Sequence, residues 1–222
     1  MGGRILTRPG LGLLILWLLL AAAAPASGQP SPIDTTGLAA GEHSRMHMLL
    51  EKTIFQVDVL TLEIRFGPET AAQLDSLVDG REFSKNLADS AAAIALESRD
   101  VWARIEFKRG VGLDQFLEGV RDNLRRAEAA GILSAEDYSY ISANLPIWYA
   151  FLADRRILPG DRMVYRIRGD TLRTVFQSVG GEVLLDQVDV GPERRLSVLG
   201  GYFAPDSDFR DKLVRSLLQR GG

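Results

Sequence analysis

The strongest constraint on the fold is an alternation of side chains in the last third of the chain, which glycine-containing turns interrupt twice. In residues 162–168 the odd positions carry Met, Tyr and Ile, and they face away from the Arg, Val and Arg that precede them. A period of two is typical of a strand, whose successive side chains point to opposite faces. Gly169-Asp170 and Gly180-Gly181 are turn residues of the kind that join strands in hairpins. The pattern predicts a meander of three antiparallel strands.

The rest of the chain predicts further strands and a block of helices between them. Residues 46–66 predict two strands or one long bent strand, and residues 101–108 predict another. Helices are expected at 69–78, at about 82–96, from Leu113 with a strongly amphipathic pattern, from Ser134 with a kink or split at Pro146, in a short segment after Pro192, and after Pro205. This order indicates an α+β fold, an open-faced antiparallel β-sheet with helices packed on one face.

Two helix starts carry residues that favour capping. Ser134 is followed by Asp137 in a pattern similar to a capping box. Asp206 or Ser207 is expected to cap the last helix, because side-chain oxygens at that position accept from free backbone N–H groups.

The N-terminus has the pattern of a cleaved signal peptide. Arg4 and Arg8 precede an apolar run that ends at Ala24, and small residues follow it. The run has about 14 residues, against the roughly 20 that a spanning helix needs, so a permanent anchor is the weaker alternative. We expect a signal peptide at 1–28, a flexible tether at 29–44 and one domain at 45–222. The mature protein is then periplasmic or secreted, with no stable membrane anchor.

Composition excludes several kinds of site. The chain has no cysteine, so it has no disulfide and no thiolate nucleophile. Its formal net charge of -3 argues against nucleic acid as a partner. His43 and His47 are the only histidines, and on a strand their rings would lie too far apart for one metal ion. We expect no metal, no cofactor and no catalytic residue, and the oligomeric state stays open.

The stretch DQFLEGVRDN, Asp114 to Asn123, resembles the region around the catalytic tyrosine in the chalcone-isomerase-like family. The family pattern there is Y-S-x-K-V-x-E-N. The positions that fit it are Gln115, Glu118, Val120, Asp122 and Asn123. Phe116 stands at the tyrosine position and Gly119 at the lysine position. The resemblance extends over about residues 45–218 and implies the family's fold, with a ligand cleft between sheet and helices, and an exported bacterial member.

The resemblance also implies the site residues and where they depart from the family. Arg45 matches an arginine of the first strands, but Asp58 falls near the family's threonine, and residues 188–196 lack the expected Ser or Thr. Phenylalanine cannot donate a hydrogen bond, so Phe116 cannot stabilise developing charge as a tyrosine does. We therefore expect no chalcone cyclisation.

The leading hypothesis is a non-catalytic protein that binds a small amphipathic molecule, with fatty acids as the class that the family's relatives imply. The candidate ligand-binding residues are Arg45, Arg109, Phe116 and Asn123. Arg109 could pair with a carboxylate, although a solvated loop arginine is the simpler interpretation, as is a core role for Phe116. One alternative is an intramolecular lyase or isomerase that uses other residues. The other is an interaction module with a filled cleft, since only an apolar cleft with convergent arginines favours binding.

Overall fold

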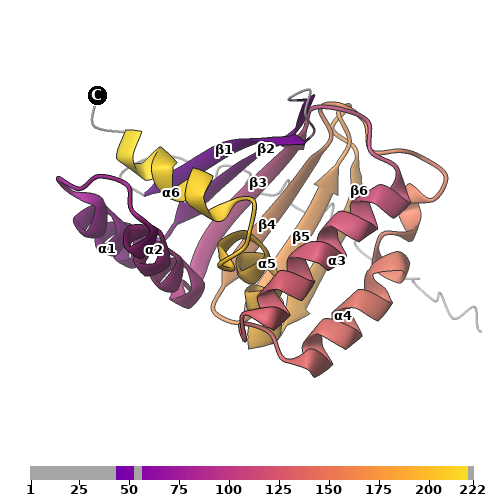
Figure 1. Ribbon diagram of the computed structural model, residues 1–222. Helices are drawn as coiled ribbons and strands as arrows, with labels where there is room; N and C mark the ends of the chain where they lie inside the picture. The colour runs from indigo at the N-terminus through magenta and orange to yellow at the C-terminus, as the bar shows by residue number, and fades with distance from the viewer. Residues whose placement is uncertain (1–43, 53–56, 220–222) are drawn as a thin grey trace, which may run out of the picture. The chain divides into compact units, whose positions relative to one another are not determined.

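The computed structural model describes residues 44–52 and 57–219, and within them the strands form one antiparallel sheet (Figure 1). The strands are β1 (Arg45–Lys52), β2 (Val57–Phe66), β3 (Asp100–Phe107), β4 (Arg162–Arg168), β5 (Thr171–Gln177) and β6 (Val183–Val190). They pair in sequence order from β1 to β6. The predicted meander is therefore confirmed, and residues 46–66 contain two strands. The expected signal peptide, and the tether as far as residue 43, lie outside the described residues.

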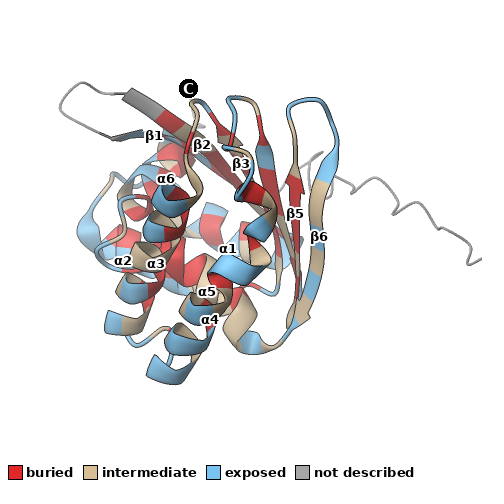
Figure 2. Ribbon diagram, turned by 90° about the vertical axis from the view of Figure 1, so that its right-hand side faces the viewer, coloured by how far each residue is buried: buried red, intermediate tan, exposed pale blue. Residues whose placement is uncertain are grey.

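All the helices in the described part pack on one face of this sheet (Figure 2). They are α1 (Pro68–Val78), α2 (Lys85–Glu97), α3 (Leu113–Ala129), α4 (Ala135–Trp148), the short 3-10 helix η1 (Ala150–Leu152), α5 (Pro192–Phe203) and α6 (Arg210–Leu218). Apolar side chains of the covered sheet face and of the helices form one core. The predicted α+β class and open-faced arrangement are confirmed.

One cross-strand row on the covered face changes character halfway across the sheet. On β1, β2 and β3 the row consists of Met46, Ile64 and Ala103, which are all buried in the core. It continues on β4, β5 and β6 with Tyr165, Thr174 and Gln187. Side chains directly opposite one another on paired strands lie close together. The register therefore brings three polar groups side by side on a face that is otherwise mostly apolar.

The opposite face of the sheet carries charged side chains around Trp102. The guanidinium groups of Arg65 and Arg104 each lie 5.6 Å from the centre of the Trp102 ring. Glu63 lies on β2 directly opposite Arg104, and its carboxylate forms ion pairs with Arg45 at 3.0 Å and with Arg104 at 2.9 Å. This face is held by ion pairs and cation–π contacts, and no helix of the described part covers it.

The two edge strands of the sheet differ in what packs against them. α6 packs along β1, where the Ser216 hydroxyl accepts a hydrogen bond from the backbone N–H of His47 at 2.9 Å. The Lys212 ammonium also reaches the Leu49 carbonyl at 3.4 Å. β6 forms the other edge, beside β5.

Of the three sequence predictions about helix caps and breaks, one is confirmed and two differ from the structure. Ser134 caps α4, because its hydroxyl accepts from the Asp137 N–H at 3.0 Å. α4 is not split at Pro146, because the helix continues through this residue to Trp148. The prediction that Asp206 or Ser207 caps the last helix is wrong. α6 begins after Phe209 without a side-chain cap. The Ser207 hydroxyl instead donates to the Gly201 carbonyl at 2.9 Å, which ties this turn to α5.

Candidate functional site

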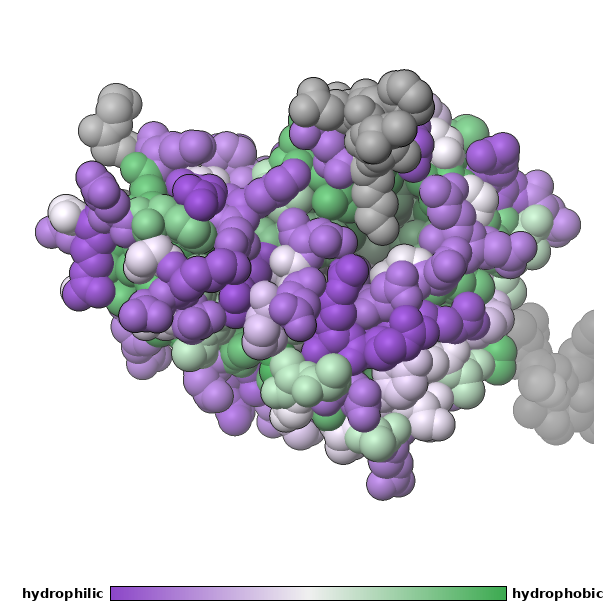
Figure 3. Space-filling model, viewed as in Figure 1, coloured by the Kyte–Doolittle hydropathy of each residue, from purple (hydrophilic) through white to green (hydrophobic). Residues whose placement is uncertain are grey.

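A cavity of about 210 Å³ lies between the covered face of the sheet and helices α3, α4 and α5. Most of its wall is apolar: Leu60 on β2, Ile105 and Phe107 on β3, Val120 and Leu124 on α3, and Leu145 on α4 all line it. The surface seen in Figure 3 is mostly hydrophilic, with apolar side chains in smaller patches between. The expected cleft is therefore present and is not filled by the protein's own side chains.

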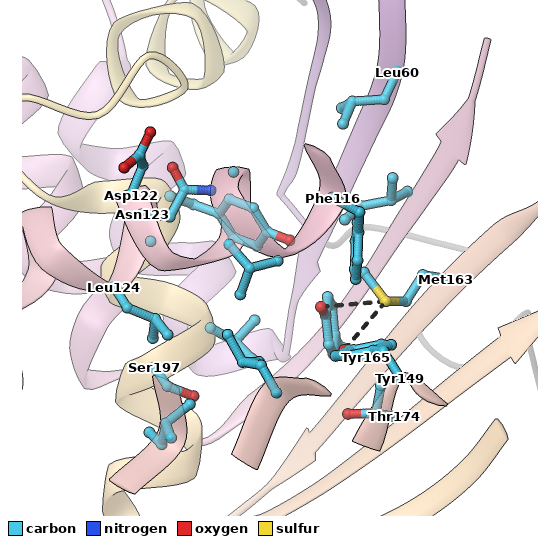
Figure 4. A pocket seen from close by; sticks show the side chains of 18 of the residues that line it. Leu60, Phe116, Asp122, Asn123, Leu124, Tyr149, Met163, Tyr165, Thr174 and Ser197 are labelled. Carbon is cyan, nitrogen blue, oxygen red and sulfur yellow. Dashed lines mark hydrogen bonds between the residues drawn. The ribbon is translucent and has the colours of Figure 1, made fainter. Parts of the chain in front are cut away.

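A cluster of three tyrosines is among the polar groups that line the cavity. Tyr149 follows α4, Tyr165 stands on β4 and Tyr202 on α5. The hydroxyls of Tyr149 and Tyr165 both donate to the sulfur of Met163, at 3.7 Å and 3.4 Å (Figure 4). Within the described part, the Tyr202 hydroxyl has no hydrogen-bond partner, although its ring packs edge-on against Phe209 at 5.3 Å.

The three phenols stay protonated at neutral pH. Burial raises the pKa of Tyr149 to about 12, and the Asp189 carboxylate acts in the same direction. Burial also raises the pKa values of Tyr165 and Tyr202 above the ordinary range for a phenol. Desolvation disfavours the phenolate, so each hydroxyl remains a hydrogen-bond donor.

The β5 and β6 side of the cavity adds further polar groups. Thr174 lies opposite Tyr165 in the sheet register and is almost fully buried. Gln187 lies opposite Thr174, and its amide donates to both oxygens of Asp189 at 3.0 Å. The Asp189 carboxylate forms no ion pair with any cation of the described part. This wall therefore carries neutral donors and one negative charge.

Phe116 lines the cavity and also belongs to the core. Its ring packs edge-on against Tyr149, with centroids 4.9 Å apart, and against Phe107 at 6.2 Å. Only 8% of Phe116 is exposed. The position where the family pattern has a phenol is apolar here, and the neighbouring ring of Tyr149 brings a phenol into the same cavity from another helix.

Arg109 lines the cavity from the loop between β3 and α3. A pair of backbone hydrogen bonds between Val111 and Ile157, at 3.0 Å and 2.9 Å, fixes this loop. The Nε atom of Arg109 is buried and has no hydrogen-bond partner within the described part of the chain. An unpaired guanidinium donor that is shielded from water costs free energy unless a partner is supplied.

Asn123 lies on α3, where it also lines the cavity. Its side-chain oxygen accepts from the Arg126 guanidinium at 3.2 Å, and Arg126 forms an ion pair with Asp208 at 3.3 Å. Gly201 of α5 packs so closely that an added Cβ would lie 3.3 Å from the Asn123 Cβ. Asn123 is thus part of the contact between α3 and α5.

Arg45 is not brought together with the other three sequence-predicted residues. It lies on the opposite face of the sheet, half exposed, in the ion pair with Glu63. Arg109, Phe116 and Asn123 all line the cavity, and Arg45 does not. The side chain of Asp58 lies outside what the structure describes.

Arg194 also lines the cavity, and the sequence did not single it out. Its guanidinium stacks on the rings of Tyr140 and Trp148, at 5.0 Å and 5.4 Å from their centres. In the described residues no group of three or more His, Cys, Asp or Glu side chains is placed to hold a metal ion. None of the described helices is long and apolar enough to span a bilayer.

Comparison with known proteins gives a structural match and no sequence match. No family model matches the sequence, and no curated protein sequence matches it. The fold is similar to the crystal structure of a fatty-acid binding protein from Arabidopsis thaliana, with a TM-score of 0.53 and 13% sequence identity. The match covers 80% of this chain and 90% of the plant protein. It shows the fold, which is the chalcone-isomerase-like fold that the sequence resemblance predicted.

Proposed function

We propose that this protein binds a fatty acid in the cavity between the sheet and helices α3 to α5. The observation that carries the proposal is Arg109, which lines a largely apolar cavity and forms no ion pair within the described part of the chain. A carboxylate can accept from a guanidinium through charge-assisted hydrogen bonds, while an acyl chain fits apolar walls. The similarity to a plant fatty-acid binding protein supports the same ligand class.

The cavity volume favours an acyl chain of medium length. One water-sized group needs roughly 10–15 Å³ of such space, so the cavity has room for on the order of 15 non-hydrogen atoms. Dodecanoic acid is therefore a suitable probe. The open cavity also argues against the alternative of an interaction module with a filled cleft.

We further propose that the protein is an exported, non-catalytic relative of the chalcone-isomerase-like family. The support is the pattern of residues 114–123, the apolar ring of Phe116 at the tyrosine position, and the signal-like segment at 1–28. The alternative of an intramolecular lyase or isomerase would have to use the tyrosines of the cavity as its acids. Their raised pKa values make them poor proton donors to a reaction at neutral pH.

A titration of dodecanoic acid against wild type, Arg109→Gln and Arg45→Gln tests the binding proposal. Arg109→Gln is expected to weaken binding by about 1.5–3 kcal/mol, the contribution of a charge-assisted hydrogen bond, which is about ten- to a hundredfold in Kd. Arg45→Gln is the matched control and should leave Kd unchanged, because Arg45 lies on the other face of the sheet. Isothermal titration calorimetry measures all three.

Measuring the free energy of unfolding of the same proteins and of Phe116→Ala distinguishes a residue that serves the binding site from one that serves the core. Arg109→Gln should leave the free energy of unfolding almost unchanged, whereas Phe116→Ala should lower it by about 3–5 kcal/mol, as for other buried aromatic residues. Equal affinities of wild type and Arg109→Gln, or no saturable binding, would contradict the proposed function.

A further inference from the structure

The hydroxyl groups of the tyrosine cluster have few hydrogen-bond partners. Tyr149 and Tyr165 share one acceptor, the sulfur of Met163, at 3.7 Å and 3.4 Å. A thioether sulfur is a weak acceptor. The hydroxyls of Thr174 and Tyr202, which also line the cavity, have no hydrogen-bond partner in the described residues. The phenols of Tyr149 and Tyr165 also hydrogen-bond to each other, so these two have only one another and a weak acceptor as partners, while Thr174 and Tyr202 have none in the described residues.

This deficit is unusual for a buried surface. Buried polar groups in folded proteins are nearly always hydrogen-bonded, because an unpaired donor costs about 1–3 kcal/mol. Phenylalanine or leucine at the same positions would pack without that cost. The sheet register strengthens the point, since Tyr165, Thr174 and Gln187 interrupt a row that is apolar on β1, β2 and β3.

The charge of Asp189 determines what kind of hydrogen-bond acceptor a ligand can place beside the tyrosines. Asp189 lies near enough to Tyr149 to raise its pKa, and it pairs with the Gln187 amide rather than with a cation of the described part. A second carboxylate at this wall would be repelled by Asp189 in a medium of low dielectric. A neutral oxygen with free lone pairs meets no such repulsion and can accept from two phenols.

We propose that the ligand of this cavity carries a second, uncharged oxygen along its acyl chain, a keto or hydroxyl group, which accepts hydrogen bonds from Tyr149 and Tyr165. This proposal rests on the proposed function, because Arg109 holds the carboxylate. The ligand class is then an oxygenated fatty acid, and Tyr149 and Tyr165 are the residues that distinguish it from an unsubstituted one.

The test compares dodecanoic acid with keto derivatives of the same length, in which the carbonyl lies near the carboxylate, in mid-chain or near the methyl end. Calorimetry with the wild-type protein should show that at least one derivative binds about five- to fiftyfold more tightly than dodecanoic acid. That range corresponds to about 1–2.3 kcal/mol for two neutral hydrogen bonds.

Conservative variants give a readout that a purely structural role would not produce. Tyr165→Phe and Tyr149→Phe should each weaken the preferred keto acid by about three- to tenfold. They should leave dodecanoic acid bound as well or better, because a donor that it cannot satisfy has been removed. Tyr138→Phe is the matched control: it is a partly buried tyrosine of α4 that does not line the cavity, and it should change neither affinity.

The outcomes separate this proposal from the one on which it rests. If dodecanoic acid and every keto derivative bind wild type equally, the oxygenated ligand is ruled out and fatty-acid binding stands. If a keto acid is preferred but both Tyr→Phe variants keep the preference, the assignment to the phenols is wrong. If no acid binds at all, both proposals fail together.

Discussion

Residue by residue, the site differs most from the family pattern at Phe116. The sequence alone shows that the phenol is missing from this position. The structure adds that Tyr149 packs edge-on against the Phe116 ring and supplies a phenol from a different element. Tyr149 could not be found from the sequence, because it follows the last turn of α4, where helical periodicity no longer predicts which way a side chain points.

The absence of a phenol at Phe116, and the presence of the Tyr149 phenol beside it, lead to a prediction about catalytic activity. Wild-type protein is expected to show no conversion of chalcone to flavanone above the uncatalysed rate. Tyr149 and Tyr165 donate to a sulfur in an apolar pocket, and Gly119 stands where the family pattern has a lysine. An absorbance assay at neutral pH measures this, with a plant chalcone isomerase as the positive control. Turnover that depends on Tyr149 or Tyr165 would establish the lyase alternative instead.

Among the elements, α5 is the one that sequence reasoning described least well. A short helical segment was expected after Pro192, whereas α5 runs to Phe203 and includes Gly200 and Gly201. Glycine lowers helix propensity, so a local pattern disfavours this length. Packing explains it: a Cβ on Gly200 would lie 2.9 Å from the Ala127 Cβ of α3 and 2.9 Å from Ile132. The two glycines let α5 approach α3 and so close one side of the cavity.

This packing predicts opposite effects of one substitution at two helical glycines. Gly200→Ala is expected to destabilise the protein by about 1–2 kcal/mol, because overpacking costs about 1–3 kcal/mol and the Ala127 Cβ cannot rotate away. Gly119→Ala on α3 meets nothing within 4 Å and should stabilise by up to about 1 kcal/mol through helix propensity. Urea unfolding of both variants gives the comparison. A gain in stability for Gly200→Ala would mean that α5 is not held against α3 as described.

Strands were easier to predict than the site they form. The alternation in residues 162–168 and the two glycine turns defined the meander, because strand pairing between neighbours is local. The polar row of Tyr165, Thr174 and Gln187 needed the cross-strand register as well. A bulge near Phe176 shifts that register by one position, and nothing in the sequence marks it clearly. Arg109 could be selected by its charge and its place after a strand, but its missing partner could not.

For the molecule as a whole, the sequence predicted the α+β class and the packing of helices on one face of the sheet. It did not predict which side chains of the first strand would lie on that face. Arg45 illustrates this limit. Its neighbour Met46 is buried in the core, so the alternation of β1 sends Arg45 to the opposite face, toward Glu63. Arg45 therefore lies on the outer face of the sheet, and the cations that line the cavity come from the loop after β3 and from α3 and α5.

Export is the prediction that concerns the whole chain. Processing is expected after the small residues near Ala26, so the mature protein should begin between Ser27 and Ser31. N-terminal sequencing of the periplasmic or secreted fraction measures this. An intact N-terminus at Met1 in the membrane fraction would falsify the cleaved signal peptide. A variant with Leu14→Arg, which interrupts the apolar run, is the control and should remain unprocessed.

The contact of α6 with β1 joins the last element of the described chain to the first. The strand pairings of the sheet all link strands that follow one another in the sequence, so each pair can form without waiting for the end of the chain. The open backbone groups of β1, by contrast, wait for residues 210–218. Unpaired strand edges favour association between nascent chains. The β1 edge of the sheet therefore stays open until the final nine-residue helix has packed along it.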